Sequence, residues 1–329
     1  MNVLSLFDGM ACGRLALERA GLIVTNYYAS EVDKYAIIVA KRNWPDIVHI
    51  GDVCKVRVVD LPFITDLLIG GSPCQGLSLA GKRLNFNDPR SKLFWEYHRI
   101  YKECLAINPN IKFMLENVCM DKDSEGVITD AMGVQPILIN SALVSAQNRE
   151  RLYWTNIGPG YTDLVGTRIS EIPQPKDRRI LLKDIIEDGI VDRNKSYCID
   201  ANYAKGEQRE LSHEGKAHGY NKGGFRKVKK FPTLRSCTSE NYLVERMSIR
   251  NKSRTVRGGG RNSSPGSRQE WDNVYDSEIE YRKLIVTECE RLQTVPDGYT
   301  SGVSNSQRYK MLGNGWNVET IVHIFGYLK

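Results

Sequence analysis

Short apolar runs alternate with longer amphipathic stretches along the first half of the chain. The apolar runs predict strands at Val3–Phe7, Val24–Ser30, Ile47–Gly51, Leu67–Gly70 and Lys112–Leu115. The stretches between them predict helices at about 14–20, 34–43 and 91–105. Strands that alternate with helices indicate an α/β fold with a doubly wound, mostly parallel sheet. Such sheets bind ligands at the carboxyl ends of their strands, so we expect the chemistry to gather there.

The pattern changes between about 188 and 277. Glycine, lysine and serine become frequent there and the hydrophobic periodicity fades, which predicts a smaller domain inserted into the first. A regular pattern returns near Tyr281 and ends in an apolar, helical segment, Val318–Leu328. We therefore divide the chain into residues 1–187, an inserted domain at 188–279 and a return segment at 280–329.

Positive charge is concentrated in the inserted segment. Between Lys216 and Arg268 there are fourteen basic residues and two acidic ones, whereas the net charge of the whole chain is only +7. A basic block on an otherwise acidic chain is typical of a polyanion-binding surface, although a solvated Lys/Arg-rich loop would have the same composition. Arg257 and Arg261 flank three glycines, and a glycine-rich basic loop can approach a phosphate backbone closely. Nucleic acid is therefore the favoured partner.

Composition excludes several other classes of protein. The 329 residues are 41% hydrophobic and 26% charged, as in ordinary globular proteins. No apolar run reaches the roughly 18 residues that a membrane span requires. Eight cysteines without a CxxC pair and five scattered histidines indicate neither a disulfide scaffold nor a metal site. The first residues also lack the pattern of a secretory signal, so we expect a cytoplasmic protein.

Turns with acidic residues and glycine follow the first three predicted strands. Phe7, Asp8 and Gly9 begin a turn that lets the backbone approach a bound ligand. Glu31 ends the second strand and Asp52 follows the third, where carboxylates can accept hydrogen bonds from a ribose and from an exocyclic amine. Each acid alone would more often be a helix cap or a solvated charge. One acid after each successive strand, however, matches the recognition of a nucleoside.

A second group of reactive residues follows the later strands. Cys74 comes directly after Pro73 in a turn at the end of the fourth strand, and Glu116 ends the next strand. A single cysteine is by default a buried structural residue. Arg149 and Arg151 alternate, so in an extended chain both side chains point to one face. A thiol, a carboxylic acid and two guanidinium groups form a set suited to covalent catalysis.

In this order the motifs resemble those of the cytosine-5 DNA methyltransferases. The matching segments are Phe7–Gly13, Glu31, Gly51–Val53, Ser72–Gln75, Glu116–Val118, Gln147–Arg151, Glu288–Pro296 and Gly313–Asn314. Several motifs in the family's order are far more specific than any one of them. The first turn and the Gly315–Val318 segment are similar to the vertebrate de novo DNA methyltransferases, but the chain has no room for their chromatin-reading modules. We therefore expect a compact prokaryotic or phage enzyme.

The resemblance implies a Rossmann-like methyltransferase fold that uses S-adenosylmethionine and acts on double-stranded DNA. Cys74 would add to carbon 6 of a flipped-out cytosine, and protonated Glu116 would hold the ring nitrogen and the exocyclic amine. Arg151 would bind the carbonyl oxygen of the base, and Arg149 would support the Cys74 loop and a nearby phosphate. The base that removes the carbon-5 proton is left unidentified.

The resemblance also assigns the remaining contacts and the domains. The residues expected to bind the cofactor are Phe7, Asp8, Gly9, Glu31, Val32, Asp52, Val53, Pro73, Leu93 and Asn314. The residues expected to bind the DNA substrate are Gln75, Ser78, Arg257 and Arg261. The first two belong to a loop, 75–90, that would close as a lid. Residues 1–187 become the catalytic and cofactor-binding domain, 188–279 the target-recognition domain, and 280–329 the segment that completes the catalytic domain.

Three other functions compete with this interpretation. A tRNA cytosine-5 methyltransferase shares the catalytic motifs, but the Cys-Phe-Thr signature of that branch is missing from the second domain. A catalytically inactive regulator would lack the nucleophile or the glutamate, and a nicotinamide dehydrogenase would explain the sheet but not Cys74 with Glu116. We rank the DNA methyltransferase first and the tRNA enzyme second. We expect a monomer without a metal, with a cognate restriction endonuclease as a candidate partner.

Overall fold

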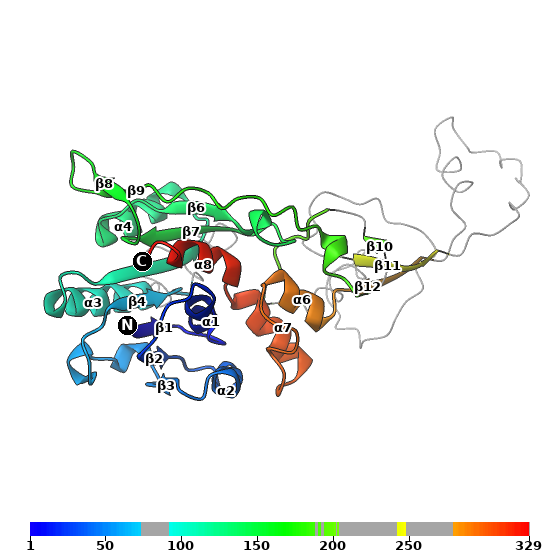
Figure 1. Ribbon diagram of the computed structural model, residues 1–329, viewed down its shortest axis with the longest axis horizontal. Coiled ribbons are helices and arrows are strands. Elements are labelled where there is room, and N and C mark those ends of the chain that lie inside the picture. Colours follow the sequence, from blue (N-terminus) through cyan, green and yellow to red (C-terminus); the bar gives the residue numbers. More distant parts are fainter. Residues whose placement is uncertain are drawn as a thin grey trace, which may run out of the picture.

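The computed structural model describes residues 1–73, 92–187, 190–191, 194–201, 203, 242–247 and 279–328 (Figure 1). The strands are β1 (Asn2–Leu6), β2 (Asn26–Ser30), β3 (Val48–His49), β4 (Leu67–Gly70), β5 (Lys112–Val118), β6 (Ile137–Asn140), β7 (Glu150–Thr155), β8 (Gly160–Thr162), β9 (Arg168–Ser170), β10 (Ile190–Val191), β11 (Tyr242–Met247) and β12 (Ile279–Lys283). The helices are α1 (Cys12–Arg19), α2 (Lys34–Asn43), α3 (Lys92–Ile107), α4 (Lys122–Met132), α6 (Val286–Leu292), α7 (Asn305–Asn314) and α8 (Val318–Phe325).

Seven strands form one sheet in the order β3-β2-β1-β4-β5-β7-β6. The five neighbouring strands β3, β2, β1, β4 and β5 run parallel, and β7 runs antiparallel to both β5 and β6. The predicted doubly wound, mostly parallel sheet is therefore confirmed. The helix at 34–43 and the strand at 67–70 have the predicted bounds. The third strand is shorter than predicted, because Gly51 turns the chain with a left-handed φ of 78°.

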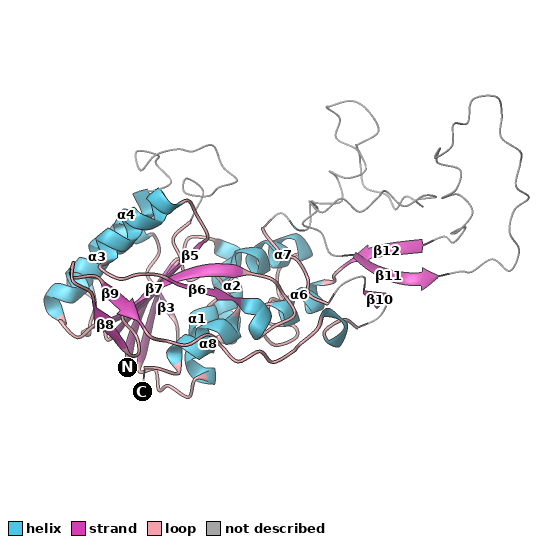
Figure 2. Ribbon diagram, turned by 90° about the horizontal axis from the view of Figure 1, so that it is seen from above, coloured by secondary structure: helices cyan, strands magenta, loops and turns pink. Residues whose placement is uncertain are grey.

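Helices cover both faces of the sheet, and the strand residues alternate between two hydrophobic cores. Val3 and Ile69 belong to the core that also contains α1, α2 and α8. Leu4 and Leu68 belong to the opposite core, beneath α3 and α4. Figure 2 shows these two helices on one side of the sheet and α1 with α8 on the other. Because neighbouring strand residues point to opposite faces, a slip of one residue would exchange the two cores, so the pattern fixes the register.

A smaller sheet precedes the last part of the chain, which packs against the large sheet. The antiparallel strands β10, β11 and β12 form the smaller sheet, which lies beyond α6 and α7 (Figure 1). Tyr203, within the predicted insertion, contacts the start of the return segment. Its carbonyl accepts from Lys283 Nζ at 3.0 Å, and its hydroxyl accepts from the Leu284 N–H at 3.2 Å. In these parts of the chain no helix is both long enough and apolar enough to cross a bilayer.

Candidate active site

Backbone amides at the carboxyl ends of β1 and β2 converge on the carboxylate of Glu31. Its Oε2 accepts a hydrogen bond from the Gly9 N–H at 2.7 Å. Its Oε1 accepts from the N–H groups of Val32 and Asp33, both at 2.7 Å. These three bonds fix the orientation of the carboxylate at the mouth of the first turn. Two residues expected at a cofactor site, Gly9 and Glu31, are thereby in direct contact.

The turn after β1 has an unusual backbone conformation. Phe7, Gly9 and Ala11 have φ of 57°, 59° and 65°, all in the left-handed region. Residues other than glycine adopt this region rarely, at a cost of about 1–3 kcal/mol each, and such residues cluster at ligand-binding segments. The Phe7 side chain packs against the core beneath α3. The turn therefore combines strain with a fixed position, as expected for a segment that holds a ligand.

Asp8 is buried within the same turn. Its Oδ1 accepts hydrogen bonds from the hydroxyls of Ser5 and Tyr27, each at 2.6 Å. Its Oδ2 has no hydrogen-bond partner among the described residues. Burial raises the pKa of the Asp8 carboxyl to about 6, against the opposing effect of the two hydroxyls. Asp8 therefore shapes the turn from inside and keeps one oxygen unpaired.

The other residues expected at the cofactor lie around this edge in different environments. The Asp52 carboxylate accepts from the Cys54 N–H at 3.0 Å, so it caps the short 3-10 helix at 53–55, which was the alternative role for a single acid. Val53 is buried, and Leu93 packs against the same core. Val32 is 72% exposed, which leaves an apolar side chain free beside Glu31. Pro73 and Asn314 are also exposed.

Glu116, near the end of β5, is held by a different donor at each oxygen. Arg151 Nε lies 3.1 Å from Oε1, and the indole Nε1 of Trp316 donates to Oε2 at 3.1 Å. Glu116 is only 9% exposed. The sequence grouped Glu116 with Arg149 and Arg151 as one catalytic set, but it predicted neither the ion pair with Arg151 nor the contact with Trp316. The position of Trp316, just after the Gly313–Asn314 motif, was the available signal.

Arg149 and Arg151 point to one face of the chain, as their alternation predicted. Both guanidinium groups donate to the sulfur of Cys198, from Arg149 Nη1 at 3.2 Å and from Arg151 Nη2 at 3.6 Å. Burial opposes the charge of Arg151, yet the neighbouring Glu116 carboxylate raises the pKa of this guanidinium above its ordinary value. Cys198 is a contact that the sequence did not predict.

Arg149 has a different environment from the one expected. Its guanidinium is buried and donates to the carbonyl oxygens of Ile199 at 3.1 Å, Gly313 at 3.2 Å and Gly315 at 2.9 Å. Burial, together with the charge of Arg151, lowers the pKa of Arg149. The contact that we expected between Arg149 and a DNA phosphate is not supported by this arrangement, because the guanidinium faces backbone carbonyls inside the protein. Arg149, directly before β7, instead ties this strand to Ile199, in the first part of the predicted insertion, and to the end of α7.

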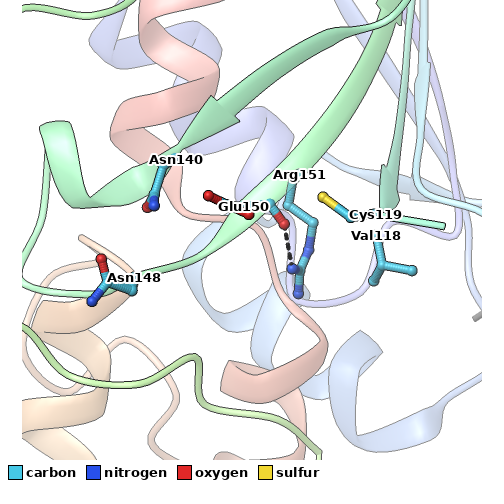
Figure 3. Close-up of a pocket in the computed structure, with 6 residues that line it drawn as sticks. All are labelled: Val118, Cys119, Asn140, Asn148, Glu150 and Arg151. Carbon is cyan, nitrogen blue, oxygen red and sulfur yellow. Dashed lines mark hydrogen bonds between the residues drawn. The ribbon is translucent and has the colours of Figure 1, made fainter. Parts of the chain in front are cut away.

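A pocket of about 470 Å³ adjoins the Glu116–Arg151 ion pair (Figure 3). It is lined by Val118, Cys119, Asn140, Asn148, Glu150 and Arg151. Figure 3 shows the Arg151 guanidinium at this pocket, where its Nη1 donates to the Glu150 carbonyl at 2.7 Å. All three nitrogens of Arg151 therefore have an acceptor, and the side chain has one preferred orientation at the pocket wall.

Several predicted site residues lie outside the described residues. They are Cys74, Gln75, Ser78, Arg257 and Arg261. The described chain ends at Pro73, directly before the expected nucleophile, and resumes at Lys92. Where side chains are described, no three His, Cys, Asp or Glu residues form a group that could hold a metal ion.

A family model and individual sequence relatives both match this chain to DNA methyltransferases. The model of the C-5 cytosine-specific DNA methylase family matches residues 1–329. The Type II methyltransferase M1.ScrFI of Lactococcus lactis subsp. cremoris is 30% identical over 336 residues, which cover 97% of this chain and 76% of that protein. The Type II methyltransferase M.NlaX of Neisseria lactamica is 28% identical over 342 residues, which cover 100% of this chain and 96% of that protein.

Solved structures share the fold at lower sequence identity. The Entamoeba histolytica methyltransferase EhMeth has a TM-score of 0.65 and 14% identity, with 100% of this chain and 97% of that chain covered. Spodoptera frugiperda DNMT2 has a TM-score of 0.61 and 16% identity, with 99% of each chain covered. At these identities the likeness shows the fold alone.

Proposed function

This chain belongs to the C-5 cytosine-specific DNA methylase family and is a DNA (cytosine-5-)-methyltransferase, and we propose that Cys74 and Glu116 carry out its reaction. The observation that supports these roles is the geometry of Glu116. Its carboxylate lies near the end of β5, and β5 pairs with β4, the strand whose following turn leads to Cys74. Arg151 and Trp316 orient the two carboxylate oxygens separately. A carboxyl group oriented in this way is suited to bind the edge of a cytosine.

Cys74 is the nucleophile in this proposal. Its thiolate adds to carbon 6 of cytosine, so that a sulfur–carbon bond forms and the electron pair of the 5,6 double bond moves into the ring. Glu116, protonated, donates to the ring nitrogen and stabilises the charge that this addition develops. Carbon 5 would then use this electron pair to bond the methyl carbon of bound S-adenosylmethionine, so that the sulfur–methyl bond breaks and S-adenosylhomocysteine leaves. Loss of the carbon-5 proton restores the double bond and expels the Cys74 thiolate. The cytosine must first leave the duplex, at a cost of a few kcal/mol.

S-adenosylmethionine is the proposed cofactor, and it supplies the methyl group when bound. The edge formed by β1 and β2 fits this molecule, because Glu31 has a carboxylate of fixed orientation beside the exposed apolar side chain of Val32. Glu31 would accept hydrogen bonds from the ribose, and Val32 would contact the adenine. The strained turn around Gly9 would bring its backbone close to the rest of the cofactor.

The basic segment is the proposed DNA-reading part, within a target-recognition domain at 188–279. Fourteen basic residues between Lys216 and Arg268 support electrostatic binding of the phosphate backbone. Changing Arg257 and Arg261 to alanine should reduce the slope of log affinity against log salt by about one for each phosphate that an arginine neutralises in the wild-type complex. An unchanged slope would exclude these two arginines as phosphate-binding residues.

The proposal includes the cellular setting of the enzyme. The relatives M1.ScrFI and M.NlaX are named as bacterial Type II methyltransferases, which favours a cytoplasmic enzyme with a cognate restriction endonuclease. We propose that the chain acts as a monomer.

The decisive experiment measures transfer of labelled methyl groups from S-adenosylmethionine to duplex DNA, with total tRNA in parallel. The wild-type protein should label DNA at carbon 5 of cytosine, and Cys74→Ser should label neither substrate while still binding DNA. Cys54→Ser is the matched control, because Cys54 is an exposed free thiol next to the cofactor edge. Full activity of Cys74→Ser would remove Cys74 as the nucleophile.

A further inference from the structure

Trp316 connects the candidate catalytic carboxylate with the first turn. Its indole Nε1 donates to Glu116 Oε2 at 3.1 Å. An indole N–H can only donate, so it requires that Oε2 be an acceptor in this arrangement. Arg151 requires the same of Oε1 from the other side. Two donors on two oxygens determine the plane of the carboxylate, which a single partner would leave free to rotate.

Gly71 makes room for the indole, and Gly13 lies at the other end of the ring. A Cβ on Gly71 would lie 2.8 Å from Glu116 Oε2 and 3.0 Å from Trp316 Nε1, closer than side chains tolerate. A Cβ on Gly13 would lie 3.4 Å from Cζ3 at the other end of the ring. The ring therefore lies between the end of β4 and the start of α1. Any larger residue at Gly71 would separate the indole from the carboxylate.

We propose that Trp316 is a positioning residue that orients Glu116 for catalysis. The inference rests on the proposed role of Glu116. The hydrogen bond from Trp316 crosses from the return segment to β5, so a part of the chain distant in sequence determines how the carboxyl group faces the base. The same ring lies beside Gly13 in the first turn of α1, so the return segment, β5 and α1 meet at this indole.

The test separates kcat from KM in Trp316→Phe, which keeps an aromatic ring and removes the N–H. We expect kcat to fall about 10-fold, the size expected when a buried hydrogen bond to the Glu116 carboxyl group is removed. The KM values for DNA and for S-adenosylmethionine should stay within about twofold of wild type. Gly71→Ala should have the same effect, because it separates the two partners without removing either.

Trp154→Phe is the matched control. The Trp154 indole donates to the Thr129 hydroxyl at 3.0 Å in the core beneath α3 and α4, so this variant loses a hydrogen bond of the same kind away from Glu116. Its kcat should equal that of wild type. Wild-type kcat in both Trp316→Phe and Gly71→Ala, or a loss that Trp154→Phe reproduces, would overturn the inference. A raised KM with unchanged kcat would also overturn it, since Trp316 would then act in binding.

Glu116→Gln distinguishes this failure from that of the proposed function. If Glu116→Gln keeps full activity, the catalytic role of Glu116 is wrong and the role of Trp316 falls with it. If Glu116→Gln is inactive while Trp316→Phe and Gly71→Ala are unchanged, only the positioning role is refuted.

Discussion

Gly313→Ala is expected to destabilise the protein far more than an ordinary glycine-to-alanine change in a helix. Gly313 lies in α7, directly against the backbone of a segment in the first part of the predicted insertion. A Cβ at this position would come well inside 3.0 Å of three backbone atoms, namely the carbonyl carbon and oxygen of Asp200 and the nitrogen of Ala201. Ordinary contacts of a Cβ are 3.4–4 Å, so the two backbones would have to separate by on the order of 1 Å.

The magnitude follows from what resists this separation. The segment is held by the Asn148 N–H, which donates to the Ser196 carbonyl at 2.9 Å, and by Arg149 Nη1, which donates to the Ile199 carbonyl at 3.1 Å. Overpacking alone costs about 1–3 kcal/mol. Weakening two hydrogen bonds adds about 1–2 kcal/mol, while the better helix propensity of alanine returns about 1 kcal/mol. We therefore expect a net loss of about 3 kcal/mol in the free energy of unfolding.

Urea unfolding, followed by circular dichroism, measures this loss as a lower midpoint at constant slope. Gly126→Ala is the matched control, because Gly126 lies in α4 and a Cβ there would meet no atom within 4 Å. That variant should be as stable as wild type or more stable by up to about 1 kcal/mol. A Gly313→Ala protein within about 1 kcal/mol of wild type would refute the reasoning, since the segment would then move without cost.

Three further predictions concern single side chains. Burial raises the pKa of Asp8 to about 6, so between about pH 4 and pH 6 the folded protein keeps a proton that the unfolded chain has lost. The free energy of unfolding therefore falls by up to about 3 kcal/mol as the pH rises through this window. Asp8→Asn has no such carboxyl group, so in urea titrations its free energy of unfolding relative to wild type should be higher at pH 7 than at pH 4. An equal difference at both pH values would contradict this. Cys198→Ala should lower kcat several-fold, because two arginines lose a shared acceptor, and unchanged kinetics would show that the sulfur contributes nothing. Arg149→Lys should lower the free energy of unfolding by about 2–3 kcal/mol, because an ammonium cannot reach all three carbonyls, and a wild-type urea midpoint would refute that.

The pattern of the chain predicts the sheet and the common face of Arg149 and Arg151. Both depend on local features, because apolar runs form strands and alternation on a strand determines which face a side chain occupies. The strand order then places the end of β5 beside that of β4. Asp52 shows the limit of this reasoning, since a carboxylate after a strand can also cap a helix, as Asp52 does at residues 53–55.

The contacts made by the return segment could not be predicted in this way. Trp316 reaches Glu116 across 200 residues of sequence, and no periodicity relates the two positions. The same holds for Arg149, whose partners are backbone carbonyls that any sequence possesses. Only the packing of α7 and α8 against the sheet brings these groups together.

The Arg149 contacts also impose an order of events during synthesis. Arg149 leaves the ribosome's catalytic centre 164 residues before Gly313 and 166 before Gly315. At about 5–20 residues per second, this interval lasts roughly 8–33 s. During that time the Arg149 guanidinium lacks two of its carbonyl partners, although β5 and β7, the strands that carry Glu116 and Arg151, have already been made. The sheet of a nascent chain is therefore synthesised well before the contacts that join this buried charge to the end of α7.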